Sequence, residues 1–191
     1  MRSPTAVRIY FVRLLHGRRV CRLAPPAVTS AAIAGTGDLV CQVAIEERPA
    51  VDWWRAGTMT AIGGLLTHPA LLRWYSKLHS LMPGQHAGAI ARRLVLHHCA
   101  FAPLLLVPAC VGAASVCEGH PPLSNVRHAW WPAVLCHWLV VLPEQVLNAW
   151  LVPLHFQLLF ANAGTLLWCT ALSWLIHRPH ARGPRIGPRH V

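Results

Sequence analysis

Lysine and arginine are nearly excluded from the long apolar stretches of this chain, and that exclusion limits its possible folds more than any other feature. None of the 17 lysine and arginine residues lies between Leu94 and Val126 or between His128 and His177. Each such residue costs roughly 2.5 to 3.5 kcal/mol at the centre of a bilayer on insertion scales. Only 12% of the residues are charged and 54% are hydrophobic. The sequence therefore predicts an all-α integral membrane protein.

The net charge of +11 does not indicate a nucleic-acid-binding protein. The basic residues flank apolar blocks, whereas nucleic-acid binders usually place them among polar residues on one surface. No GxSxG motif or phosphate-binding loop is present, so we predict no enzyme, no catalytic residue and no cofactor. The seven cysteines form no CxxC pair, and most are expected to be buried as small apolar side chains.

The sequence also contains no metal-binding motif. His97 and His98 are adjacent, so on a helix their side chains diverge by about 100° and do not chelate one metal without help. The chain has six acidic residues, too few for a di-metal membrane enzyme, which needs many convergent histidines or carboxylates. We therefore predict no metal site.

Apolar segments lie at about 26–45, 56–72, 94–116 and 130–176. The last is more than twice the ~20 residues that cross a bilayer. The stretches before, between and after the expected spans contain six, two, four, one and four basic residues. The larger and smaller numbers alternate. The positive-inside rule gives this alternation for four crossings with both termini on the more positive side of the membrane. We expect a small helical bundle with about four transmembrane helices. In it, 130–152 forms a kinked, interfacial or re-entrant helix and 153–176 the last span.

The ends of the chain differ from this membrane domain, which we expect to span 25–177 as a single unit. Residues 1–24 contain six arginines and no acidic residue. Such a segment is typical of mitochondrial targeting, although it also fits a basic tail that lies on anionic headgroups. Residues 178–191 are basic and rich in proline and glycine, and we expect this tail to be disordered.

Polar side chains within the apolar segments are the functional candidates, because each must find a partner or water. On a helix, Asp38 and Gln42 lie one turn apart on the same face as Ala31, Ala34 and Gly35. This small-residue seam allows close helix packing and would carry the polar pair into the protein interior. The pair either clamps helices together or lines a pore.

Two further polar rows lie in the last apolar block. Glu144, Gln145 and Asn148 follow His137 in the first, and Asn162 belongs to the second, with His155, Thr165 and Cys169. On neighbouring helices these rows would line an aqueous path or form buried seams, and the sequence leaves both open. Pro103 and Pro108 are expected to kink the third segment without breaking it if neighbouring helices supply hydrogen-bond partners.

Several short motifs occur together in order. The first part of the chain contains Pro26 and Thr29 in a PxxT step, Gly37-Asp38 and Gln42 in GDxxxQ, Asp52 and Arg55 in DxxR, Pro69 ahead of Trp74-Tyr75, Pro103, and Glu118-Gly119. The second part contains Trp138, Gln145, Asn148, Val152-Pro153, Asn162, Trp168 and Leu172-Ser173. Over 26–174 the chain resembles the family of the 22-kilodalton peroxisomal membrane protein and its mitochondrial inner-membrane relatives. It departs from the family pattern at His97-His98, where relatives have Asp-Gln, and at Gln157, where they have arginine.

The resemblance implies a membrane channel that passes small solutes and contributes to mitochondrial or peroxisomal homeostasis, or else a structural scaffold without transport. It implies location in the mitochondrial inner membrane, with a peroxisomal membrane as the alternative. The expected partners are the lipid bilayer, small-molecule solutes and a second copy of the chain. The candidate residues for pore lining or helix clamping are Asp38, Gln42, Glu144, Gln145, Asn148, Gln157 and Asn162.

Overall fold

The computed structural model describes residues 24–84, 87–153 and 155–178, and every regular element in this part of the chain is helical. The predicted all-α fold is therefore confirmed. Apart from Ala24 and Arg178, the predicted targeting segment (1–24) and the predicted disordered basic tail (178–191) lie outside the described residues.

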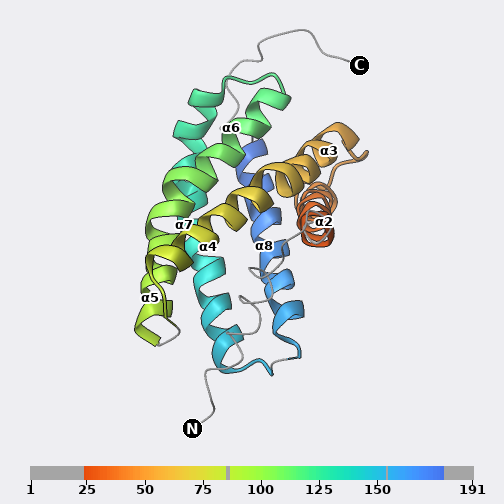
Figure 1. Ribbon diagram of the computed structural model, residues 1–191. Coiled ribbons are helices and arrows are strands. Elements are labelled where there is room, and N and C mark those ends of the chain that lie inside the picture. The colour runs from red at the N-terminus through yellow and green to blue at the C-terminus, as the bar shows by residue number, and fades with distance from the viewer. Residues whose placement is uncertain (1–23, 85–86, 154, 179–191) are drawn as a thin grey trace.

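The helices join end to end into five long rods (Figure 1). The rods are α2 (Ala24–Val40) with η2 (Cys41–Ile45); α3 (Trp53–Ala61) with η3 (Ile62–Thr67) and α4 (His68–Leu81); α5 (Ala87–Leu96) with η4 (His97–Leu106) and α6 (Val107–Cys117); α7 (Pro122–Trp150); and α8 (Gln157–His177). The η segments have π-helical hydrogen bonds. This pattern is rare in proteins, and where it occurs it is often found at functional sites.

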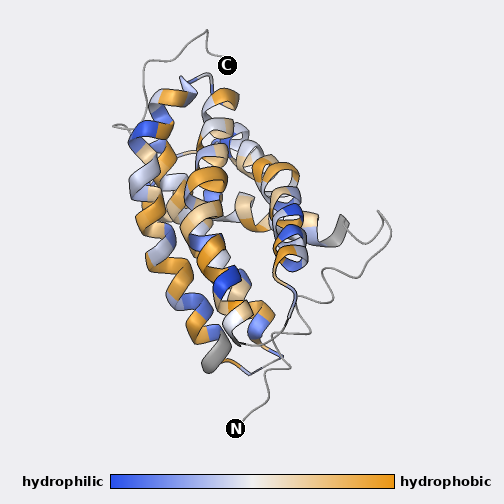
Figure 2. Ribbon diagram, turned by 60° about the vertical axis from the view of Figure 1, so that its left-hand side comes forward, coloured by the Kyte–Doolittle hydropathy of each residue, from blue (hydrophilic) through white to orange (hydrophobic). Residues whose placement is uncertain are grey.

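Three helices are long and apolar enough to cross a membrane, at Pro26–Ile45, Gly88–Cys117 and Gln157–His177. Large apolar side chains also point outward in other helices, among them Leu65 and Leu139, which are 81% and 76% exposed. Hydrophobic residues make up much of the length of these helices, as the colours of the ribbon show (Figure 2). Such surfaces are suited to lipid, while the expected number of four crossings stays a prediction.

Helix α7 differs from the helix expected over 130–152. It begins at Pro122 and continues through Pro132 and Pro143 to Trp150, 29 residues in all. Pro121 is the N-cap and Pro122 the first helical residue, where a proline loses no helical hydrogen bond. At 1.5 Å per residue, α7 is about 43 Å long, which exceeds the thickness of a bilayer core, but it is not among the three helices that are also apolar enough to cross.

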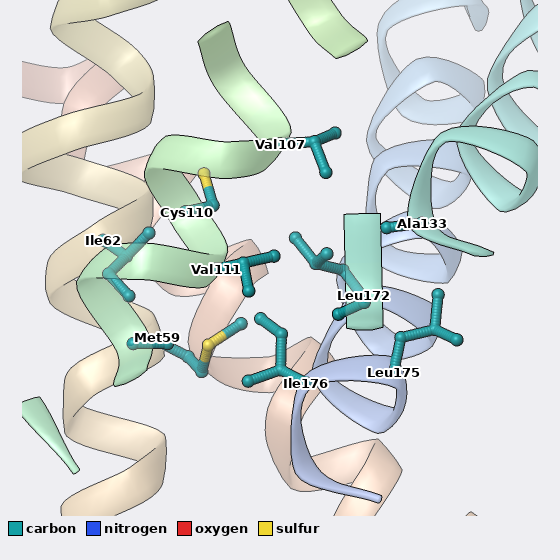
Figure 3. Close-up of a cluster of buried hydrophobic side chains, with 11 residues drawn as sticks. Met59, Ile62, Val107, Cys110, Val111, Ala133, Leu172, Leu175 and Ile176 are labelled. Atoms are coloured by element: carbon teal, nitrogen blue, oxygen red, sulfur yellow. The ribbon is translucent and has the colours of Figure 1, made fainter. Parts of the chain in front are cut away.

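The hydrophobic core lies where the second, third and fifth rods meet α7. Met59 and Ile62 reach it from the second rod, and Val107, Cys110 and Val111 come from α6 (Figure 3). Ala133 of α7 and Leu172, Leu175 and Ile176 of α8 complete the labelled set. Each of these side chains is at most 8% exposed, so the core fixes the relative positions of four rods.

Glycines bring α2 and η3 into close contact. A Cβ atom added to Gly63 would lie 2.5 Å from the Ala34 Cβ and 2.7 Å from the Ser30 carbonyl oxygen. Gly64 similarly packs on Ala31. These contacts confirm the small-residue seam, whereas Gly57 of the same rod faces open space.

The prolines of the third rod are accommodated by tryptophans of α7. In the π-helical register, where each N–H bonds the carbonyl five residues earlier, Pro103 and Pro108 would have donated to the carbonyls of His98 and Pro103. The Trp138 indole donates to the His98 oxygen at 2.9 Å, and the Trp130 indole donates to the Pro103 oxygen at 2.6 Å. A neighbouring helix thus supplies the missing donors, as predicted.

Replacing Trp138 with phenylalanine is expected to destabilise the protein by about 1–3 kcal/mol, because the His98 carbonyl loses its donor in a buried setting. Denaturant unfolding in detergent micelles measures the loss. Trp131→Phe is the matched control, since Trp131 is 51% exposed and should change stability by less than about 0.5 kcal/mol. In a Pro103→Ala background, which restores a backbone donor, Trp138→Phe should cost less. An equal cost in both backgrounds would contradict this account.

Candidate functional site

Asp38 is the centre of a buried polar cluster where α2, α3 and α8 meet. Its carboxylate is fully buried, and it accepts a hydrogen bond from the Arg55 Nε at 2.7 Å and from the Gln42 Nε2 at 2.7 Å. The Ser173 hydroxyl donates to the same oxygen as Arg55. Three donors therefore satisfy a charge that would otherwise be very costly in an apolar interior.

Arg55 connects this carboxylate to a second one. Only 2% of Arg55 is exposed, and its Nη1 donates to the Glu46 Oε2 at 2.8 Å. Its Nη2 donates to the Ser173 Oγ at 2.9 Å and to the Cys41 Sγ at 3.4 Å. The planar guanidinium thus holds groups from several elements at once, which a lysine ammonium does not reproduce.

Gln42 closes the turn between the first two rods. Its Oε1 accepts from the Asp52 backbone N–H at 2.7 Å, and its Nε2 donates to the Asp52 carbonyl at 3.1 Å. Asp52 is the N-cap of α3, since its side chain accepts from the Arg55 N–H at 3.1 Å. One cap therefore starts the helix that delivers Arg55 to Asp38.

The cluster extends to the end of the third rod through α8. His177 lies one turn after Ser173, and its Nδ1 is 2.6 Å from the Ser173 carbonyl oxygen. The His177 Nε2 is 2.5 Å from the Glu118 Oε1. We call Asp38, Gln42, Glu46, Arg55 and Ser173 the Asp38 network, with His177 and Glu118 as its extension.

Acidic and basic side chains alternate along the Asp38 network, in the order Asp38, Arg55, Glu46 and the neighbouring Arg48. Burial tends to raise the pKa of Glu46, but the hydrogen bond and positive charge of Arg55, together with Arg48, hold its pKa below the usual range. The Arg48 Nε is 2.7 Å from the same Glu46 oxygen that Arg55 contacts. Asp38 and Glu46 are therefore compensated by Arg55 within the network and by Arg48 beside it.

Motifs that are far apart in the sequence meet in this network. The GDxxxQ, DxxR, Glu118-Gly119 and Leu172-Ser173 motifs contribute Asp38 with Gln42, Arg55, Glu118 and Ser173. The sequence indicated Asp38 and Gln42 as a pair but missed Arg55 as their partner. The DxxR spacing was the available signal, because it places a capping acid one turn before a basic residue.

The remaining candidates lie on α7 and α8, away from the Asp38 network. Glu144 crosses the contact between these helices, since its Cγ would be 2.3 Å from a Cβ added to Gly164. Its Oε1 is buried without a hydrogen-bond partner in the described chain, as is the Oδ1 of Asn148. Both residues are only partly buried overall. These atoms differ sharply from the fully satisfied Asp38.

Gln157 and Asn148 tie together the two ends of the α7–α8 connection. The Asn148 Nδ2 donates to the Gln157 carbonyl at 3.1 Å, and the Gln157 Nε2 donates to the carbonyls of Asn148 and Val152 at 3.3 and 3.2 Å. Asn162 lies further along α8 and is partly buried. The structure thus gives Gln157 a turn-closing contact.

Gln145 belongs instead to a set of histidines. The His98 Nε2 is 3.3 Å from the Gln145 Oε1, and the His98 Nδ1 is 3.1 Å from the His137 Nε2. His97 lies beside them, with its ring centroid 4.8 Å from that of His98. We call His97, His98 and His137 the histidine cluster, which the sequence did not predict.

One hollow in the described surface lies at the start of α7. It is lined by Leu123, Ser124, Arg127 and His128. It contains none of the predicted pore residues, and no pore through the described chain is visible at the Asp38 network, where Asp38 and Gln42 are both fully buried.

Comparison with known proteins identifies clear relatives. Residues 115–173 match the Mpv17 / PMP22 family. Protein SYM1 of Gibberella zeae is 30% identical over 171 residues, which cover 86% of this chain and 97% of that protein. The mitochondrial inner membrane protein Mpv17 of Homo sapiens is 26% identical, with 79% of this chain and 88% of that protein covered. No solved structure matches.

Proposed function

Because this chain belongs to the Mpv17 / PMP22 family, we propose that it acts as a membrane channel that passes small solutes across an organelle membrane. We assign it to the mitochondrial inner membrane, since a human relative is named as a protein of that membrane. Imaging a fluorescent fusion against mitochondrial and peroxisomal markers tests this location. Co-localisation with the peroxisomal marker would contradict the mitochondrial assignment.

The observation that carries the channel proposal is the unsatisfied polar surface between α7 and α8. The Glu144 Oε1 and Asn148 Oδ1 have no hydrogen-bond partner among the described residues. A carboxylate oxygen within an apolar helix pair is costly unless water or a solute reaches it. We infer that Glu144, Asn148 and Asn162 border a hydrated path along α7 and α8, with Gln157 closing one end of the pair and Gln145 facing the histidines instead.

Asp38 and Gln42 have a different proposed role. Both are fully buried and bonded to protein groups, so they clamp the first two rods to α8 and do not face the path. Residues 25–177 then form a single membrane domain in which the clamp supports the path. Any ion preference would come from Glu144, because it is the acidic residue left beside the proposed lining.

Conductance of the purified protein in planar bilayers tests this lining. The wild type is expected to prefer cations weakly, and Glu144→Gln should bring the cation-to-anion permeability ratio close to one while leaving the protein folded. Glu47→Gln is the matched control, since Glu47 is exposed in the loop after η2. Unchanged selectivity in Glu144→Gln would remove this residue from the lining. The absence of any conductance or solute flux from the wild type would overturn the channel proposal.

A scaffold without transport is the second candidate, and the closed Asp38 network favours it. Its charges satisfy one another with no polar group directed to a path. A scaffold predicts no solute flux in liposomes and a stable complex with other membrane proteins after mild solubilisation. Flux that depends on Glu144 would exclude it as the whole function.

A further inference from the structure

The histidine cluster is buried in the contact between η4 and α7. His97, His98 and His137 are 5%, 1% and 5% exposed. One ring nitrogen from each lies within 4.8 Å of the others. Two of these residues are adjacent in sequence, and the third comes from another helix 39 residues further on. The helix contact therefore brings together three neutral nitrogen ligands that the sequence separates.

The distances within the cluster suit a transition metal. The His98 Nδ1 and the His137 Nε2 are 3.1 Å apart, close to the ~3.3 Å that separates two nitrogens bound to tetrahedral zinc at about 2.0–2.1 Å. The nitrogen of His97 would need to move inward by roughly 1–2 Å to complete a three-nitrogen site.

Unused polar atoms point to a ligand independently of these distances. The Nδ1 atoms of His97 and of His137 are buried and have no hydrogen-bond partner in the described chain. Buried polar atoms are nearly always satisfied, so two in one cluster require an explanation. A metal bound among the three rings supplies a partner for the Nδ1 of His97, whereas the Nδ1 of His137 stays outside the site, because His137 faces His98 through its Nε2.

The surroundings hold the rings as ligands are held in metal sites. The Gln145 Oε1 lies 3.3 Å from the His98 Nε2. As an acceptor it favours the tautomer of His98 that carries its hydrogen on Nε2, which leaves the Nδ1 lone pair directed at the cluster. His97 stacks on Tyr75 and Phe101, with centroids 5.1 and 5.7 Å apart. The rings of His137 and Trp168 pack edge to face, with their centroids 4.8 Å apart. Gln145 is thus a positioning residue for the ligand set.

We propose that His97, His98 and His137 form a binding site for one divalent first-row transition metal, of which Zn²⁺ is the best fit. Imidazole ligands suit zinc, copper, nickel and cobalt, and three of them leave one coordination position open. The site is independent of solute passage, because it is built from the packing of η4 on α7. A water molecule would occupy the open position.

Cobalt binding to the full chain in detergent tests the site. After chelator treatment, the wild type is expected to bind one Co²⁺ with the visible absorption of a tetrahedral nitrogen site, and Zn²⁺ should displace it. His137→Gln and His97→Phe should each weaken binding at least tenfold, and Gln145→Leu should weaken it by roughly 10-fold to 100-fold. His97→Phe keeps an aromatic ring against Tyr75 and Phe101, so it separates loss of a ligand from loss of packing.

His128→Gln is the matched control, since His128 is an exposed histidine of α7 and its replacement should leave cobalt binding unchanged. Size-exclusion profiles and tryptophan fluorescence establish that each variant is folded. No tetrahedral cobalt spectrum from the wild type would overturn the proposal. Equal binding by the wild type and by folded His97→Phe would also overturn it, because the metal would then be held by other histidines.

Discussion

Replacing Arg55 with methionine is expected to destabilise the protein by about 3–5 kcal/mol, the range seen when one partner of a buried ion pair is removed. The variant leaves the Asp38 carboxylate fully buried, with only Gln42 and Ser173 to bond it. It also removes a donor from Glu46. Thermal unfolding in detergent, followed by tryptophan fluorescence, measures the loss as a lower midpoint and a lower free energy of unfolding.

A second substitution distinguishes an uncompensated charge from lost packing. If the charge dominates, combining Arg55→Met with Asp38→Asn should be less destabilising than Arg55→Met alone. Arg48→Met is the surface control, because the Arg48 side chain is 31% exposed and its ion pair should contribute less than about 1 kcal/mol. A double variant that is less stable than the single one would show that packing around the Arg55 stem is the larger effect.

Gly63→Ala is expected to produce the next largest effect. It should lower the free energy of unfolding by about 1–3 kcal/mol, because the new methyl group would overlap the facing backbone. It would lie 2.7 Å from the Ser30 carbonyl oxygen, and the Ser30 hydroxyl also donates to the Gly63 carbonyl at 3.1 Å. The α2 backbone would have to move outward, which would weaken the contacts of Asp38 as well. Unfolding in detergent measures the change.

Gly57→Ala is the control for this substitution within the same rod. A Cβ atom added there meets nothing within 4 Å, and alanine is favoured over glycine in a helix by roughly 0.5–1 kcal/mol. Gly57→Ala should therefore leave stability unchanged or raise it slightly. Equal losses for the two alanine variants would mean that the α2–η3 contact is not as close as described.

Local helical periodicity predicted part of the site. Asp38, Gln42 and the small residues before them share a face through their spacing alone, and the structure confirms that this face is buried. The all-α class followed from the absence of charge in the apolar segments. Both predictions rest on neighbours within one helix, where sequence separation determines direction.

Contacts between different helices were not predictable in this way. Arg55 was noted as part of a motif, but only the turn made by Gln42 and Asp52 brings it to Asp38. Spacing alone shows that His97 and His98 diverge on one helix, and His137 lies 39 residues further along the chain. Charge and tryptophan mark membrane boundaries and predict a start of the helix at 130, whereas Pro121 and Pro122 mark its actual start.

The indole hydrogen bonds of Trp130 and Trp138 have a consequence for biosynthesis. Until α7 is present, the carbonyls of Pro103 and His98 lack the donors that these indoles provide, and an unsatisfied carbonyl costs several kcal/mol in hydrocarbon. Moving the third rod into lipid without α7 is therefore energetically unfavourable. The rod should stay with the insertion machinery until α7 emerges, so that the third rod and α7 leave that machinery together.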